Sequence, residues 1–121
     1  MQMHIHRLRT ADIEAEHYIV ATEKLISGNP SQTLWMEYID ASKKFFVGVW
    51  HSNIGKWKIS YTEEEQCQIL EGISIIGDLE GNHVTVRVGD RFVIPRGFIG
   101  TWEVVEPTKK SFVIYEPGAS S

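Results

Sequence analysis

The feature of this sequence that most constrains its fold is a series of short apolar runs separated by turn residues. Each run is rich in β-branched or aromatic side chains, and a polar or glycine-bearing break follows it. The runs cover residues 33–39, 45–50, 57–61, 67–76, 83–88, 91–95, 101–105 and 111–115. Their regular spacing of roughly 8–12 residues predicts an all-β sandwich or barrel. The pair Gly81-Asn82 predicts a tight hairpin between two of the runs.

One segment, residues 13–27 (IEAEHYIVATEKLIS), is the only plausible helical stretch. We expect it to contribute an N-terminal arm or a helical turn and not a domain of its own. The 121 residues indicate a single domain. We therefore predict an N-terminal arm packed on the barrel over residues 1–30, the barrel itself over residues 31–116, and a flexible tail over residues 117–121.

Charge and composition exclude several classes of function. The net charge of −4 arises from 12 basic and 16 acidic residues, and no basic stripe exists for a phosphate backbone to follow. No run approaches the roughly 20 apolar residues that span a bilayer, and the N-terminus is too polar for a secretory signal. Cys67 is the single cysteine, which excludes an internal disulfide. These absences predict a cytoplasmic protein that binds neither nucleic acid nor membrane.

Alternation along the runs predicts which side chains point into the barrel. Trp57, Ile59 and Tyr61 share one face of their strand, whereas Lys58 and Ser60 share the other. On the returning strand Glu65, Cys67, Ile69 and Glu71 share one face. Further on, Phe92 and Ile94 share one face, and so do Gly100, Trp102 and Val104.

Two stretches carry a family resemblance, WKISYTEEEQCQILEG (residues 57–72) and GDRFVIPRGFIGTWE (residues 89–103). They resemble the paired motifs of the cupin superfamily, whose members are double-stranded β-helix or jelly-roll barrels. The first cupin motif ends in a glutamate and a glycine, which Glu65 and Gly72 match. The second begins with a glycine and continues to Pro-x-Gly, which Gly89, Pro95 and Gly97 match. The resemblance implies a single-domain, all-β cupin barrel with an N-terminal arm.

The histidines of the cupin motifs are replaced in this chain. The His-x-His pair of the first motif falls on Ile59 and Tyr61, or on Lys58 and Ser60 if the longer spacing of the motif applies. The alternation pattern favours the first register. Gly100 stands where the second motif has its histidine.

A metal site in such a barrel needs about three converging protein ligands. Of the four usual cupin ligands only Glu65 remains, and Cys67 is the one other donor close to it. We therefore predict no bound metal and no other cofactor. The expected pocket is a cavity lined by aromatic rings, one carboxylate, one thiol and one phenol.

Glu65 and Tyr61 are the candidate catalytic residues. A carboxylate on an inward face needs a partner or a purpose, so Glu65 is interpreted either as a general acid–base or as one half of an ion pair with a lysine or arginine across the barrel. Tyr61 could donate a proton or hold a substrate carbonyl. The candidate substrate-binding residues are Trp57, Cys67, Arg96, Trp102 and Lys110. The alternatives are a core role for Cys67 and the two tryptophans, and simple exposure for Arg96.

Over residues 45–115 the chain more specifically resembles the cupin subgroup that contains the ureidoglycine aminohydrolase domain. That resemblance implies a small-molecule-binding barrel, and because the metal ligands are replaced we predict a metal-independent enzyme acting on a polar or nitrogenous metabolite such as a ureide. The alternatives are a non-catalytic metabolite-binding or sensor module, and a ureidoglycine aminohydrolase-like metalloenzyme with unusual ligands. Sheet edges in small barrels are commonly covered by a second copy, so we also predict a homodimer.

Overall fold

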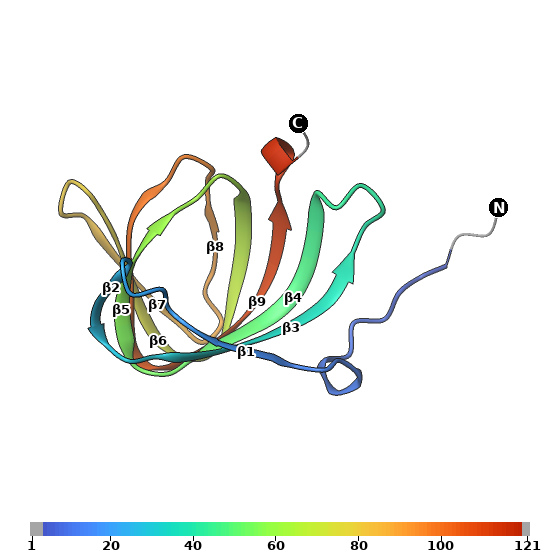
Figure 1. Ribbon diagram of the computed structural model, residues 1–121, viewed down its shortest axis with the longest axis horizontal. Helices are drawn as coiled ribbons and strands as arrows, with labels where there is room; N and C mark the ends of the chain where they lie inside the picture. The colour runs from blue at the N-terminus through green and yellow to red at the C-terminus, as the bar shows by residue number, and fades with distance from the viewer. Residues whose placement is uncertain (1–3, 120–121) are drawn as a thin grey trace.

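The computed structural model of the protein describes residues 4–119. The elements in chain order are η1 (Thr10–Asp12), β1 (Glu16–Ile19), β2 (Leu25–Gly28), β3 (Ser31–Ile39), β4 (Phe45–Ser52), β5 (Gly55–Ser60), β6 (Glu64–Asp78), β7 (His83–Arg87), β8 (Arg91–Ile94), β9 (Ile99–Tyr115) and η2 (Pro117–Ala119). The predicted all-β class is confirmed, and the nine strands form one sheet that curls around an interior (Figure 1). No helix within residues 4–119 has the length and apolar character needed to cross a membrane. Residues 120 and 121, the end of the predicted tail, lie outside the described residues.

Two long antiparallel strands, β6 and β9, form the spine of the barrel. The C-terminal half of β9 pairs with β4 on one side and with the first half of β6 on the other. The N-terminal half of β9 pairs with β5 and with the second half of β6. The outer strands complete the order β1-β3-β4-β9-β5-β2, while β7 and β8 pair with β6. Every side chain on the inner face of the spine therefore points toward the same interior.

The spine bends at Gly72, where three register shifts interrupt the pairing of β6 with β9. Gly72 has φ of +83°, and a Cβ atom placed on it would lie 2.0 Å from the carbonyl oxygen of Pro107. Only glycine fits such a conformation and such a close approach. Beyond the bend the inward positions change from Glu65, Cys67 and Ile69 to Ser74 and Ile76, all of which are buried.

The sequence prediction of two strands over residues 101–105 and 111–115 is corrected, because β9 runs through both without a break. Pro107 lies between them and lacks the N–H that a central strand needs. In the structure it sits opposite the bulge at Gly72, where the ladder is already interrupted, so the strand bends and does not end.

The prediction of helical character for residues 13–27 is wrong. Glu16–Ile19 pairs with β3 as strand β1, Leu25–Gly28 pairs with β5 as strand β2, and a turn joins them. Both strands add to free edges of the sheet, and tertiary pairing of this kind overrides a weak helical propensity. The segment predicted as an arm thus supplies two short strands of the sheet.

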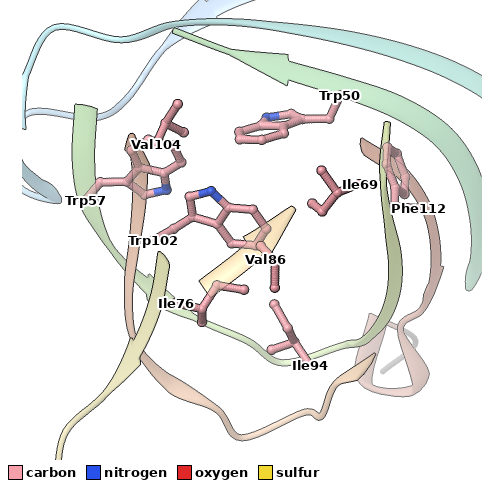
Figure 2. Packing of buried hydrophobic residues seen from close by; sticks show 9 residues of the cluster. All are labelled: Trp50, Trp57, Ile69, Ile76, Val86, Ile94, Trp102, Val104 and Phe112. Carbon is pink, nitrogen blue, oxygen red and sulfur yellow. The ribbon is translucent and has the colours of Figure 1, made fainter. Parts of the chain in front are cut away.

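The hydrophobic core lies inside the barrel and is built from side chains of six strands, β4 to β9. Its buried members are Trp50, Trp57, Ile69, Ile76, Val86, Ile94, Trp102, Val104 and Phe112 (Figure 2). Three of them are indoles from three neighbouring strands, β4, β5 and β9. Ring centroids of Trp50 lie 5.7 Å from those of Trp102 and 6.0 Å from those of Trp57, with edge-on interplanar angles of 74° and 61°. This is a favoured geometry for aromatic pairs.

Candidate functional site

A buried ion pair lies inside the barrel. Lys110 of β9 places Nζ 2.8 Å from Oε2 of Glu65 of β6, and the two side chains are 7% and 4% exposed. Removal of two charges from water is costly, and only close contact of this kind offsets that cost. Glu65 therefore has a lysine partner, as the alternative interpretation expected, but that lysine lies on the neighbouring strand β9 of the same ladder and not across the barrel.

Two indole rings cage the lysine ammonium. Nζ of Lys110 lies 4.4 Å from the ring centroid of Trp102 and 4.9 Å from that of Trp50, distances at which a cation is attracted to an aromatic face. The ring of Trp102 is held in place because its Nε1 donates a hydrogen bond to Oγ of Ser74 at 3.1 Å. Ser74 is in turn 2.7 Å from Oγ1 of the buried Thr108. The cation is thus held by its carboxylate and by two rings, of which Trp102 is anchored by a hydrogen bond.

Burial determines the charge state of the remaining polar groups. Burial raises the pKa of the Cys67 thiol to about 12 and raises the pKa of the Tyr61 phenol well above its ordinary value. Burial alone would lower the pKa of Lys110, but the acidic groups of Cys67, Glu65 and Tyr61 outweigh it and raise the pKa. At neutral pH the direct contact with the Glu65 carboxylate is the effective cause, since thiol and phenol are protonated. The site therefore carries one positive charge, one negative charge and two neutral donors.

The buried thiol predicts a loss of stability in mild alkali that depends on Cys67. In the unfolded chain the exposed thiol loses its proton above its ordinary pKa of 9.0, whereas burial in the folded protein raises the pKa of the thiol to about 12. The contribution of the buried thiol to the free energy of unfolding is thus fully present below pH 9. It declines as pH rises toward 12, by at most about 1.4 kcal/mol per pH unit.

We expect the free energy of unfolding of the wild type to fall by about 1 kcal/mol more than that of Cys67→Ala between pH 8 and pH 10. Urea unfolding at a series of pH values measures the two slopes, and the titration of tyrosines and lysines is common to both proteins and cancels in the comparison. Parallel curves for the two proteins would contradict the assignment of a buried neutral thiol.

Three hollows share lining residues, and two of them touch the ion pair. The inner cavity, of about 110 Å³, is lined by Gln32, Trp50, Trp57, Ile59, Tyr61, Trp102 and Lys110. A second hollow of about 210 Å³, here named the apolar chamber, shares Trp50, Tyr61 and Lys110 with it and also touches Glu65. A third of about 360 Å³, the entrance groove, lies under β1 and the turn that follows, and shares Gln32, Trp57 and Tyr61 with the inner cavity. Lys110 and Tyr61 therefore stand where the inner cavity meets the apolar chamber.

The structure brings together most of the residues that the sequence singled out. Glu65, Cys67 and Lys110 form the polar cluster, while Tyr61, Trp57 and Trp102 border its cavities. Arg96 lies elsewhere. It is exposed and faces Glu64 at 3.8 Å on the surface, outside the three hollows.

Sequence reasoning missed Trp50, Gln32 and Tyr18. Alternation in the run FFVGVW would have placed Trp50 on an inward face with Phe46 and Gly48. Gln32 is only 5% exposed and carries no local signal of burial. Tyr18 lines both the entrance groove and the apolar chamber, but it belongs to the segment that was interpreted as helical.

The positions of the missing histidines do not fit a metal. Ile59 offers no donor atom, and Gly100 has no side chain. A Cβ atom on Gly100 would lie 1.9 Å from the carbonyl oxygen of Gly77, so this backbone leaves no room for any ligand there. Among residues 4–119 no three His, Cys, Asp or Glu side chains lie close enough to hold a metal ion. The ammonium of Lys110 occupies instead the contact with Glu65 that a metal would take.

Comparison with known families agrees with this barrel. The profile of the EutQ-like cupin domain family matches residues 39–112, more than half of the chain. The chain belongs to the cupin superfamily. Significant matches are absent among curated proteins.

Solved structures show the same cupin fold. A protein of unknown function from Pseudomonas syringae, of the DUF861 family, has a TM-score of 0.76 at 18% identity, over 84% of this chain and 43% of that chain. The ethanolamine utilization protein EutQ of Salmonella typhimurium has a TM-score of 0.64 at 12% identity, over 86% and 97% of the two chains. The polyketide cyclase RemF of Streptomyces resistomycificus has a TM-score of 0.68 at 19% identity, over 93% and 80%. This cupin chain thus spans less than half of the Pseudomonas protein, and identities this low establish the fold alone.

Proposed function

We propose that this cupin is a metal-independent enzyme acting on a small neutral molecule that carries a carbonyl group, ureides and other amides included. The observation that supports this proposal is the pair of Lys110 and Glu65, which are held 2.8 Å apart at the edge of two cavities. A carbonyl oxygen and a neighbouring acidic hydrogen would face a donor and an acceptor at once. A net charge on the ligand is disfavoured, because the site is already neutral and an additional buried charge would be unpaired.

The proposed chemistry is proton transfer next to the carbonyl. The ammonium of Lys110 donates a hydrogen bond to the carbonyl oxygen and stabilises the negative charge that develops there. Glu65 accepts the proton that leaves the neighbouring carbon or nitrogen, and the bonding electrons move to the oxygen. Tyr61 is protonated at neutral pH and serves as a second donor to the same oxygen. The proton returns from Glu65 when the product is released.

One observation favours the alternative of a non-catalytic binding module. Lys110 and Glu65 already satisfy each other, so a reacting ligand must displace part of their contact. A binder needs only a hydrogen bond at the edge of the pair. The metal-dependent alternative, an activity like that of ureidoglycine aminohydrolase, would need ligands at Ile59 and Gly100, where the chain has no donor side chains.

The two alternatives differ in the effect of Glu65→Gln. With hydroxyacetone as probe, the wild type is expected to catalyse exchange of the hydrogens next to the carbonyl with deuterium from heavy water, followed by ¹H NMR. An enzyme should lose this exchange by about 10²-fold or more in Glu65→Gln while its affinity for hydroxyacetone stays similar. Glu71→Gln, which changes an exposed carboxylate opposite Lys109, is the matched control. Exchange that is absent in the wild type, together with an affinity that changes in Glu65→Gln, would support the binding module.

We also propose that a second copy of the chain covers part of the outer surface. Phe45 of β4 and Tyr115 of β9 are direct partners in the sheet and are 39% and 51% exposed, and the contact with the second copy would cover this pair. Light scattering on the eluted protein should give twice the chain mass of 13.8 kDa. Phe45→Asp should give the monomer, and a wild-type monomer at micromolar concentration would contradict the proposal.

A further inference from the structure

The apolar chamber has a lining that differs from that of the inner cavity. Apart from the polar groups at its edge, its walls are the side chains of Leu34 and Met36 on β3 and of Phe112 and Ile114 on β9. These four belong to the core of the barrel or pack against it, and Phe112 is 4% exposed. The hydrogen-bonding groups of the candidate site therefore lie at one end of a hollow that is otherwise hydrocarbon.

We propose that the ligand of this site is amphipathic, with a neutral carbonyl head at Lys110 and a short hydrocarbon tail in the apolar chamber. This inference rests on the proposed function and adds the substrate class to it. We place the tail in the chamber because the chamber and the inner cavity share three lining residues, Trp50, Tyr61 and Lys110. A head bound to Nζ of Lys110 has its substituent directed either into the small inner cavity or into the chamber, which is about twice as large.

The volume of the chamber limits the length of the tail. About 210 Å³ is room for roughly seven groups of the size of a water molecule, each about 30 Å³. With about three of these groups taken by the carbonyl head, a chain of about four carbons beyond the carbonyl fits within the apolar walls. Met36 is the specificity-determining residue in this interpretation, because its unbranched side chain borders the chamber. Its partner in the sheet is Gly48 and not a residue of the ion pair.

A series of straight-chain amides from acetamide to hexanamide tests the proposal. Binding is followed by the indole N–H signals of the four tryptophans in ¹H–¹⁵N NMR spectra. Trp50, Trp57 and Trp102 report on the site, and Trp35, whose ring lies against Lys109 away from the three hollows, is the internal control. We expect the dissociation constant to fall about fourfold for each added methylene, the equivalent of about 0.8 kcal/mol, until the chamber is full.

Two variants of Met36 should change the longest tail that the chamber accepts in opposite directions. Met36→Trp fills the chamber and should weaken pentanamide binding at least tenfold while acetamide binding changes less than twofold. Met36→Ala enlarges the chamber and should strengthen hexanamide binding, which keeps the test available if the tryptophan variant does not fold. Ile39→Trp, at the exposed end of the same strand, is the control and should change neither.

The failures of the two proposals are distinguishable. If acetamide shifts the three site indoles and longer amides bind no more tightly, the amphipathic ligand is contradicted and the proposed function stands. If amides of all lengths leave these indoles unmoved, the carbonyl head is contradicted and both proposals fall together. A chain-length dependence that persists unchanged in Met36→Trp would place the tail elsewhere and would also contradict the inference.

Discussion

Replacement of Lys110 by methionine is expected to lower the free energy of unfolding by about 3–5 kcal/mol, the usual cost of removing one partner of a buried ion pair. The variant keeps the apolar stem of the side chain but leaves the buried Glu65 carboxylate without its cation. The contacts of the ammonium with Trp50 and Trp102 are lost as well. Urea unfolding followed by tryptophan fluorescence measures the change.

Two further variants separate the buried pair from the loss of a lysine as such. Lys109→Met removes a neighbouring lysine whose distance to Glu71 is 3.9 Å on the surface, and it should cost less than about 1 kcal/mol. The double variant Lys110→Met, Glu65→Leu removes both buried charges and should regain most of the lost stability, since an apolar replacement of a buried pair is often close to neutral. If Lys110→Met and Lys109→Met lower the free energy of unfolding by equally small amounts, the pair of Lys110 and Glu65 is not the buried contact that we describe.

Replacement of Gly100 by alanine is expected to prevent folding or to cost more than about 4 kcal/mol. The added Cβ would lie 1.9 Å from the carbonyl oxygen of Gly77, a distance that Cβ atoms do not adopt. Gly100 is the direct partner of Asp78 in the ladder between β6 and β9, so the two strands of the spine would have to separate. Gly100→His, which restores the histidine of the cupin motif, should fail for the same reason and should create no metal site.

Gly97→Ala is the matched control for this prediction. A Cβ on Gly97 would have no atom within 4 Å, but φ of +90° is unfavourable for a side chain. The expected cost is therefore the conformational strain alone, about 1–2 kcal/mol. Yields of soluble protein and urea midpoints for the two variants give the comparison. A Gly100→Ala protein as stable as Gly97→Ala would show that the strands can part at this position without penalty.

Much of the candidate site could be predicted from local patterns. Alternation alone placed Trp57 and Tyr61 on the inward face of one strand and Glu65 and Cys67 on that of the next, and all four lie at the polar cluster or its cavities. The motif positions also indicated that Ile59 and Gly100 replace metal ligands. Side-chain direction in a strand depends only on the two-residue period of the backbone, so these predictions needed no knowledge of the partner strands.

The same reasoning could not decide which side chains of different strands lie next to each other. The sequence left open which lysine or arginine would pair with Glu65, and Lys110 and Arg96 were both candidate substrate-binding residues. The structure selects Lys110 because β9 pairs with both β4 and β6, which places its ammonium between Trp50 and Glu65. Arg96 follows β8 and faces Glu64 on the surface. Which cation reaches a carboxylate depends on strand order, and strand order is a property of the whole sheet.

The strand segments, the inward faces and the loss of the cupin metal ligands were thus determined by the sequence itself, because turn chemistry and the two-residue period act over a few neighbouring residues. Only the tertiary structure decided that residues 16–19 and 25–28 form edge strands, that β9 bends at Pro107 without ending, and that a lysine ammonium takes the place beside Glu65. Each of these depends on a partner strand distant in sequence, whose hydrogen bonds and burial outweigh the local preference of the segment.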